Sequence, residues 1–178
     1  MTGATGAIGP RVVQALCEAG YRVRILSRAA PGGRCLPEDV DVNVGGVTDS
    51  AAVQSAMQGV EAVIHLAAIL HIVDPAPSLR DEYERINVGG TATVVDAAVR
   101  AGIKRFVMFS TIAVYGVSGG RILTEDTPPR PDTFYGETKL RAERIVLEAR
   151  RADGQSFGTV LRLGAVYGAR VKGNYRKL

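Results

Sequence analysis

The sequence predicts an α/β protein with a doubly wound parallel sheet. Helical and extended patterns alternate from one end of the chain to the other, which is typical of βαβ units. The 178 residues are 46% hydrophobic and 22% charged, which suits one domain with a buried core and excludes a disordered chain. A glycine-rich stretch at the start leads directly into the first helical pattern.

The first half of the chain predicts two helices and three strands. Apolar residues recur at helical spacing after the glycines, and Gly20 stands where a C-terminal cap is expected. Asp49 is a good N-cap for a short helix, and the apolar run beyond it has the length and the Val and Ile content of a buried strand. The predicted elements are a helix at 12–19, strands at 21–26 and 40–44, a helix between Asp49 and Gly59, and a strand at 60–68.

The second half begins with a long helical pattern over residues 79–101. Gly89 and Gly90 in its middle each cost about 1 kcal/mol relative to alanine, which indicates a packing or ligand reason for them. The remaining predicted elements are a strand at 105–110, a loop at 124–131, a helix from 133 to 151 and a strand at 159–163.

Composition argues against several functional classes. No apolar stretch approaches the roughly 20 residues that span a bilayer, and the start does not resemble a signal peptide, so we expect a cytoplasmic protein without a membrane partner. The net charge of +4 owes much to a basic tail with few aromatic residues, so we expect no nucleic-acid partner. We also expect no metal, because the cysteines and histidines form no ligand pattern: Cys17, Cys35, His65 and His71.

The segment from Thr2 to Gly9 reads TGATGAIG. Its glycines allow a tight turn, a close approach of the backbone to a pyrophosphate, and entry into a helix whose amides face the anion. The pattern favours a dinucleotide site, although a glycine-rich turn that merely starts a helix would look the same. The candidate cofactor-binding residues of this loop are Gly3, Gly6, Ala7, Ile8 and Gly9.

A second candidate contact with the cofactor follows the strand predicted at 21–26. About 20 residues beyond the glycine loop, an acidic residue would hold the ribose hydroxyls of NAD. The chain has Ser27 and Arg28 there, a hydroxyl and a cation that suit a 2′-phosphate. The expected cofactor is therefore NADP or NAD, with NADP mildly favoured; the alternative is that Arg28 is an ordinary solvated arginine.

Tyr135 and Lys139 stand four residues apart in a predicted helix. This spacing puts a phenol and an ammonium on one face, where the cation favours the phenolate. The pair therefore has the chemistry of a proton-transfer site. The alternative is an exposed tyrosine with a lysine one turn along.

Six motifs occur in order along the chain: TGATGAIG at 2–9, HLAA at 65–68, NVGGT at 87–91, STIAVYG at 110–116, the YxxxK pair at 135–139 and LRLGAVYG at 161–168. Together they resemble the extended short-chain dehydrogenase/reductases, the NAD-dependent epimerase/dehydratase family. The resemblance implies a Rossmann-like fold, a nicotinamide cofactor, a small-molecule substrate that is commonly a nucleotide sugar, and room for a homodimer. It also implies cofactor contacts at Leu66, Ala67, Ala68, Asn87, Tyr135 and Lys139.

The same resemblance implies roles for three residues. Tyr135 is the general acid/base, Lys139 binds the nicotinamide ribose and acidifies the tyrosine, and Thr111 polarises the substrate carbonyl. The pKa of a phenol is near 10 and has to fall by about 3 units for the group to act as a base at neutral pH. One neighbouring cation lowers the pKa by about 1 to 3 units. We therefore expect the positive nicotinamide of the oxidised cofactor to contribute the rest.

The chain departs from the family directly after Thr111. Dehydratases of the family resemble one another in carrying an Asp-Glu pair there, and this chain has Ile112 and Ala113. Dehydration is therefore disfavoured, and 4-epimerisation or carbonyl reduction remains. A hydroxysteroid or flavonoid-type reductase is an alternative, and so is a catalytically silent nucleotide-binding remnant.

Compared with members of this family, the chain is expected to be truncated at both ends. Family members begin with a hydrophobic strand before the glycine loop, and only Met1 precedes Thr2 here. Without that strand, two buried strand edges would lack partners, at about 1 to 3 kcal/mol for each unpaired backbone group. We expect a fragment in which residues 1–168 form a partial NAD(P)-binding domain and residues 169–178 are a basic tail that begins a missing substrate-binding region.

Overall fold

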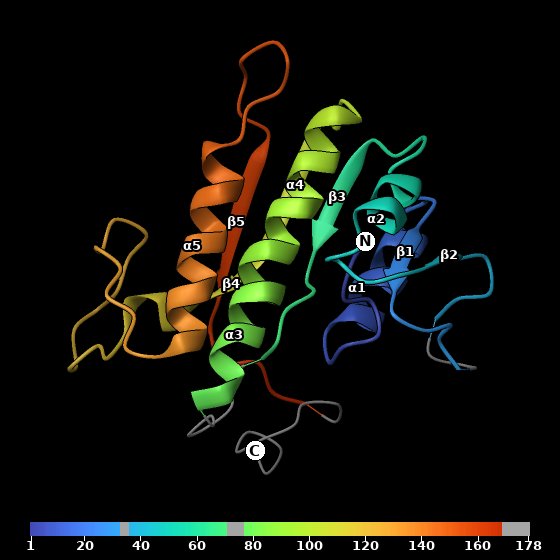
Figure 1. Ribbon diagram of the computed structural model, residues 1–178. Coiled ribbons are helices and arrows are strands. Elements are labelled where there is room, and N and C mark those ends of the chain that lie inside the picture. Colours follow the sequence, from blue (N-terminus) through green and yellow to red (C-terminus); the bar gives the residue numbers. More distant parts are fainter. Residues whose placement is uncertain (33–35, 71–76, 169–178) are drawn as a thin grey trace.

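The computed structural model describes residues 1–32, 36–70 and 77–168 and confirms the predicted alternation of strands and helices (Figure 1). The expectations for Cys35, His71 and the tail 169–178 lie outside the described residues. The strands are β1 (Arg24–Ser27), β2 (Asp41–Val44), β3 (Ala62–His65), β4 (Arg105–Thr111) and β5 (Gly158–Leu163). The helices are α1 (Gly9–Glu18), α2 (Ser50–Ala56), α3 (Arg80–Tyr83), α4 (Gly90–Arg100) and α5 (Phe134–Glu148), with 3-10 turns η1 (Pro77–Leu79) and η3 (Ile112–Tyr115) and a π-helical segment η2 (Glu84–Gly89).

All strand pairs are parallel, β1 with β2 and β4 with both β3 and β5. The start of the chain joins these two groups. Thr2 forms parallel bridges with Leu26 of β1 and His65 of β3. Its amide donates to the Ile64 carbonyl at 3.0 Å, and its carbonyl accepts from the Leu66 amide at 3.2 Å. The spatial order is therefore β2, β1, residues 1–2, β3, β4, β5.

The expectation that two strand edges lack partners holds only in part. Met1 and Thr2 pair with the carboxyl-terminal part of both edges, and the Met1 carbonyl accepts from the Leu26 amide at 2.9 Å. A small pocket lies beside them and is lined mainly by apolar side chains of β1, α2, β3 and α4. The Met1 ammonium donates to the Arg24 carbonyl at 2.6 Å, and burial, followed by the Arg24 charge, lowers its pKa to about 6.

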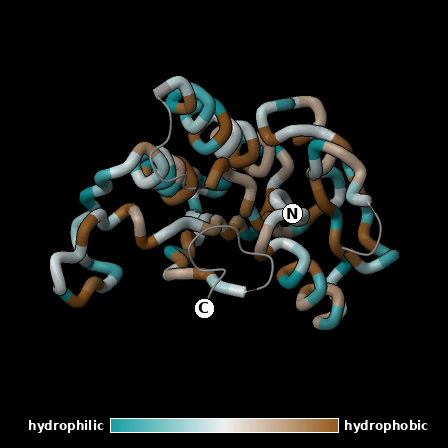
Figure 2. The backbone as a smooth tube through the Cα atoms, turned by 90° about the horizontal axis from the view of Figure 1, so that it is seen from below, coloured by the Kyte–Doolittle hydropathy of each residue, from teal (hydrophilic) through white to brown (hydrophobic). Residues whose placement is uncertain are grey.

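Helices cover both faces of the sheet, as a doubly wound fold requires. On one face α2, α4 and α5 pack over β3 and β4, with Phe106 and Met108 fully buried beneath them. On the other face α1 packs on β1, where Val13 joins Ile25 in a separate cluster. Leu26, the next residue along β1, belongs to the first cluster because successive side chains of a strand point to opposite faces. Figure 2 shows hydrophilic and hydrophobic residues alternating along the helices, as expected for amphipathic helices packed on a sheet.

Local signals in the sequence explain most element boundaries. The Asp49 carboxylate accepts from the amides of Ala51 and Ala52, which caps α2 as predicted. The Thr133 hydroxyl accepts from the Gly136 amide and caps α5. A glycine with a positive φ follows each of three helices: Gly20 after α1, Gly59 after α2 and Gly102 after α4.

The helix expected over residues 79–101 is not regular. It consists of the η1 turn, α3, the π-helical η2 and then α4. A Cβ on Gly90 would lie 2.6 Å from Cγ2 of Val47, so close packing explains this glycine. The π-helical segment contains Asn87, whose side chain is buried.

His65 connects the start of the chain to β3 and α4. Its Nδ1 lies 2.7 Å from Oγ1 of Thr2 and its Nε2 lies 3.0 Å from Oγ1 of Thr91. The Thr91 hydroxyl donates its proton to the Asn87 carbonyl, so Nε2 of His65 carries the hydrogen and Nδ1 accepts from Thr2. Burial lowers the pKa of His65 to about 3, and the charges of Lys139 and the N-terminus add to the effect.

We predict that His65 makes stability depend on pH between 6.5 and 3. The folded chain keeps the imidazole neutral in this range, whereas the unfolded chain binds a proton, so the free energy of unfolding falls as the pH falls. The contribution of one such group approaches about 1.4 kcal/mol per pH unit. Denaturant unfolding from pH 4 to 8 should show a smaller slope for His65→Gln, and equal slopes in the two proteins would contradict the prediction.

Candidate functional site

The predicted functional residues gather at the carboxyl edge of the sheet. Because the strands are parallel, their carboxyl ends meet at one edge, which lies at the bottom of Figure 1. The glycine loop follows Thr2, Arg28 follows β1, residues 66–68 follow β3, and Thr111 ends β4. Ligands of open α/β sheets bind at this edge.

The glycine loop leaves no room for side chains at two of its positions. A Cβ on Gly3 would lie 2.7 Å from the Ala67 nitrogen, and the φ of +70° at Gly3 also favours glycine. A Cβ on Gly9 would lie 2.3 Å from the Ala4 carbonyl oxygen. The helix α1 begins at Gly9, and its N-cap residue Ile8 makes no side-chain hydrogen bond to it. This bare backbone before a helix N-terminus fits a phosphate group.

The remaining candidate cofactor residues on this side of the site are Gly6, Ala7, Ile8 and Arg28. The Gly6 amide donates to the Gly3 carbonyl at 3.1 Å, which closes the turn. Ala7 and Ile8 are partly exposed between that turn and α1, and Arg28 is exposed just beyond β1.

The segment after β3 lies against the glycine loop. The Ala67 amide donates to the Thr2 hydroxyl at 3.2 Å, and Leu66 and Ala68 are partly buried on either side. The Asn87 side chain forms two hydrogen bonds with the backbone of Ile69, the residue after Ala68. It accepts from the Ile69 amide at 2.8 Å and donates to the Ile69 carbonyl at 3.2 Å. Its amide group also donates to the Thr138 hydroxyl of α5 at 3.2 Å. In this structure Asn87 therefore links the β3 loop to α5.

Thr111, Tyr135 and Lys139 come together where β4 ends and α5 begins. The Thr111 hydroxyl oxygen accepts from the Ala113 amide at 3.1 Å, which leaves its proton to donate. Thr111 and Tyr135 are joined by a side-chain hydrogen bond. Lys139 lies one helical turn beyond Tyr135, is 2% exposed, and donates to the Phe109 carbonyl at 2.6 Å.

The acid-base properties of the pair differ from the sequence expectation. Burial raises the pKa of Tyr135 above its ordinary value, the hydrogen bond with Thr111 opposes this, and Tyr83 adds to it. Burial lowers the pKa of Lys139 to about 8, with Glu143 acting in the opposite direction. Burial therefore dominates the Tyr135 pKa in the chain without cofactor, which the spacing of two residues does not reveal.

Tyr83 adds an aromatic wall to this site. Its ring is 1% exposed and meets the Tyr135 ring edge-on, with 6.5 Å between centroids. Its hydroxyl donates to the Leu70 carbonyl at 2.8 Å. Sequence reasoning did not single out Tyr83, because nothing in the local pattern places α3 beside α5.

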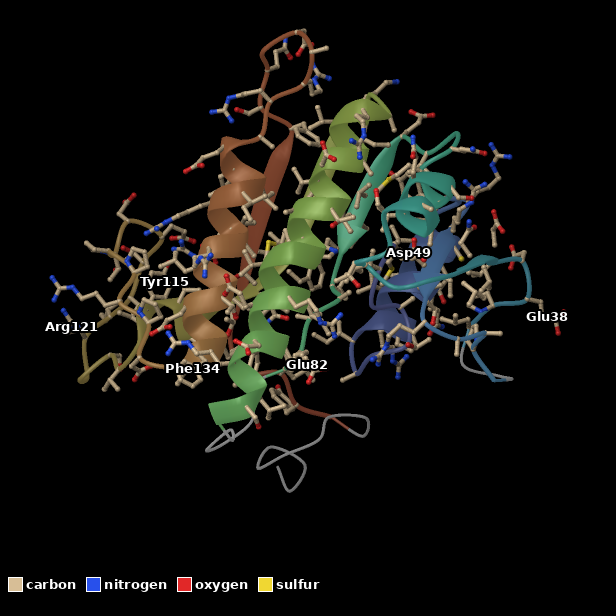
Figure 3. The ribbon with its side chains drawn as sticks, viewed as in Figure 1. Glu38, Asp49, Glu82, Tyr115, Arg121 and Phe134 are labelled. Atoms are coloured by element: carbon tan, nitrogen blue, oxygen red, sulfur yellow. The ribbon has the colours of Figure 1, made fainter. Side chains whose placement is uncertain are left out.

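A buried ionic network behind the site also escaped sequence reasoning. Glu143 of α5 is 1% exposed and receives two hydrogen bonds on Oε2 from Arg162 of β5, at 2.7 and 3.1 Å. The Ser110 hydroxyl donates to Oε1 of the same carboxylate. Arg162 also donates to the Tyr115 hydroxyl at 2.7 Å and lies over its ring. Figure 3 shows Tyr115 beside α5, near the end of the helix that begins with Phe134.

Residues 1–32, 36–70 and 77–168 contain neither a metal-binding cluster nor a membrane-spanning helix. No group of three His, Cys, Asp or Glu side chains there is placed to hold a metal ion. None of the helices in this part of the chain is long and apolar enough to cross a membrane.

The chain is similar in sequence to proteins of known activity. The chain is 34% identical over 187 residues to a 3 beta-hydroxysteroid dehydrogenase/Delta 5-->4-isomerase of Mycobacterium tuberculosis, covering 100% of this chain and 49% of that protein. It is 32% identical over 172 residues to a UDP-glucose 4-epimerase of Azospirillum brasilense, covering 95% of this chain and 49% of that protein. The chain therefore spans about half the length of the curated relatives it matches.

A solved structure extends the likeness to three dimensions. The chain superposes on a short-chain dehydrogenase/reductase superfamily protein from Agrobacterium tumefaciens with bound NAD, with a TM-score of 0.78 and 37% identity over 90% of this chain and 47% of that one. The family model described as the NAD dependent epimerase/dehydratase family matches residues 1–178. The chain thus belongs to the NAD-dependent epimerase/dehydratase family of short-chain dehydrogenase/reductases.

Proposed function

We propose that residues 1–168 form part of the cofactor-binding domain of an NAD(P)-dependent epimerase or carbonyl reductase that acts on a nucleotide sugar. The observation that carries this proposal is the meeting of Thr111, Tyr135 and Lys139 at the carboxyl edge of the sheet. A phenol hydrogen-bonded to a hydroxyl, with a buried ammonium one turn away, is an arrangement for moving a proton. The bare backbone of the glycine loop lies at the same edge.

The chain's own residues fit a nicotinamide dinucleotide. The backbone around Gly3 and Gly9 and the open start of α1 suit its pyrophosphate, and the Lys139 ammonium suits a ribose hydroxyl. When bound, such a cofactor supplies the hydride acceptor or donor. Arg28 and Ser27 lie at the end of β1, where a 2′-phosphate would distinguish NADP from NAD.

In this proposal Tyr135 transfers the proton at the substrate oxygen and Thr111 donates a hydrogen bond to that oxygen. Because the pKa of Tyr135 lies above its ordinary value, the phenol is protonated at neutral pH and is ready to act as a general acid in carbonyl reduction. In the direction that oxidises an alcohol, the phenol has to lose its proton. The positive charge of Lys139 then favours the phenolate.

The side chains after Thr111 bear on the type of reaction. Ile112, 46% exposed, and Ala113 occupy the turn that follows β4, so no carboxyl group is available there to drive an elimination. This supports epimerisation or carbonyl reduction over dehydration. The UDP-glucose 4-epimerase relative supports a nucleotide sugar as the substrate.

A reductase or dehydrogenase acting on a hydrophobic ketone or alcohol is the second candidate, and the hydroxysteroid dehydrogenase relative favours it. Incubation with UDP-glucose and with a 3β-hydroxysteroid, followed by product analysis, separates the two. A third candidate is a catalytically silent nucleotide-binding remnant. The observation that favours it is the pocket between β1 and β3, where the sheet is incompletely paired. Turnover of either substrate rules this reading out.

We predict that Tyr135→Phe lowers turnover by roughly 100-fold or more, the range expected for loss of a general acid. Affinity for NADH or NADPH, measured by fluorescence titration, should change little because the ring and the buried Lys139 remain. Tyr167→Phe is the matched control, since Tyr167 is 72% exposed. Full activity in Tyr135→Phe would refute the assignment, and no binding of either cofactor to the unsubstituted chain would refute the proposed function.

A separate prediction concerns the choice between the two cofactors. If Arg28 holds a 2′-phosphate, Arg28→Ala should weaken binding of NADPH by about tenfold, equivalent to about 1.4 kcal/mol, and leave NADH binding unchanged. Arg22→Ala is the control, because Arg22 is also exposed but lies before β1. An equal loss for the two cofactors would show that Arg28 does not select NADP.

A further inference from the structure

Glu143 is a buried carboxylate that the proposed chemistry does not use. It lies on α5 four residues after Lys139, so the two side chains share one face of the helix. Only 1% of Glu143 is exposed, and Lys139 is 2% exposed. A buried charge is costly unless it is paired, so the partners of this carboxylate indicate what it does.

Two side chains from neighbouring strands hold the Glu143 carboxylate. Arg162 of β5 donates from Nε to both carboxylate oxygens, at 3.2 and 3.1 Å, and from Nη2 to Oε2 at 2.7 Å. Ser110 of β4 donates to Oε1. The carboxylate is therefore fixed in position by hydrogen bonds from β4 and β5.

Among residues 1–32, 36–70 and 77–168, Glu143 is the negatively charged group that acts on Lys139. From β3 it faces His65, which is neutral, and from β4 it contacts the Phe109 carbonyl. On its own helix Tyr135 lies one turn before it and Glu143 one turn after it. Burial disfavours the ammonium and Glu143 favours it, and Glu143 is the charged group that acts in this direction.

Arg162 does not cancel this effect of Glu143. The Arg162 side chain is 22% exposed, whereas that of Glu143 is 1% exposed. Water therefore screens the guanidinium more than the carboxylate, and Glu143 is the charge that raises the pKa of Lys139. Arg162 is further held by the Tyr115 hydroxyl and ring, at 2.7 and 4.8 Å.

We propose that Glu143 is a positioning residue for Lys139: its buried carboxylate keeps the neighbouring ammonium charged, and Arg162 and Ser110 hold that carboxylate in place. The catalytic meaning of this role rests on the proposed function. The electrostatic coupling between the two side chains does not, and it can be measured without turnover. The alternative is an ion pair that only attaches α5 to β5.

The test is the titration of Lys139 in Glu143→Gln, which removes the charge and keeps the shape. The sequence has four lysines, so isotope labelling of lysine gives a simple NMR spectrum in which Lys139→Arg identifies the signal. The pKa of Lys139 should fall from about 8 by about 1 unit or more. It should stay closer to the parent value in Glu143→Asp, which keeps the charge.

The matched control is Glu148→Gln, an exposed carboxylate on the same helix, which should leave the titration of Lys139 unchanged. An unchanged pKa of Lys139 in Glu143→Gln, with a loss of thermal stability alone, would overturn the proposal and support the purely structural ion pair.

A second variant covers the case in which Glu143→Gln does not fold. Glu143→Gln combined with Arg162→Gln leaves no unpaired buried charge, and neutral replacements of buried ion pairs are often tolerated. The pKa of Lys139 should again fall, by less than in Glu143→Gln because the Arg162 charge is lost too, and an unchanged or higher pKa overturns the proposal.

Turnover provides a separate measurement. If the proposed function holds, the alkaline limb of the pH profile should move to lower pH in Glu143→Gln by the amount measured for Lys139. Absence of turnover in the unsubstituted chain would count against the proposed function, and the titration would still decide the coupling.

Discussion

The fold depends on the hydrogen bonds that two residues make between two groups of strands. Met1 pairs with β1 and Thr2 pairs with β3, and the Thr2 side chain adds contacts to His65 and Ala67. The glycine loop continues from Thr2, whereas Thr111 and Tyr135 belong to the β3–β5 group. This short pairing, together with the packing of Leu26 and α2 against α4, therefore sets the relative position of the glycine loop and the Thr111–Tyr135 side of the candidate site.

Burial, more than sequence spacing, sets the chemistry of the candidate site. It keeps His65 neutral, so that the imidazole serves as a fixed hydrogen-bonding link, and it raises the pKa of Tyr135. Lys139 stays useful only if its charge survives in the same apolar surroundings. Glu143, with its partner Arg162, lies one helical turn further along α5 on the same face as Lys139.

Features with local causes could be predicted from the sequence. Asp49 and Thr133 act on the amides of the next few residues, and Gly20 ends α1 through its own φ angle, so these boundaries were confirmed. The meeting of Thr111 with Tyr135 followed from the family motifs. The rise in the Tyr135 pKa of the chain without cofactor comes from burial, which the spacing of Tyr135 and Lys139 does not reveal.

Features that arise from contacts between distant residues could not be predicted. The carboxylate of Glu143 looks like any helix surface residue until Arg162, 19 positions later, is placed on the adjacent strand. The π-helical turn around Asn87 depends on how that side chain reaches Ile69 and Thr138. The bridging role of Thr2 depends on two strands that begin more than 20 residues beyond it.

The Thr2 to His65 contact also has a consequence for the order of folding. It closes a loop of 63 residues, whereas the Arg24 to Asp41 contact within the β1–β2 pair closes one of 17. The longer closure costs about 1.2 kcal/mol more in chain entropy, which is offset by the hydrogen bonds of Met1 and Thr2 and by the packing of Leu26 and α2 against α4. We therefore expect β1–β2 and β3–β5 to form as separate folding units that dock late, so that the candidate site is assembled in the last step.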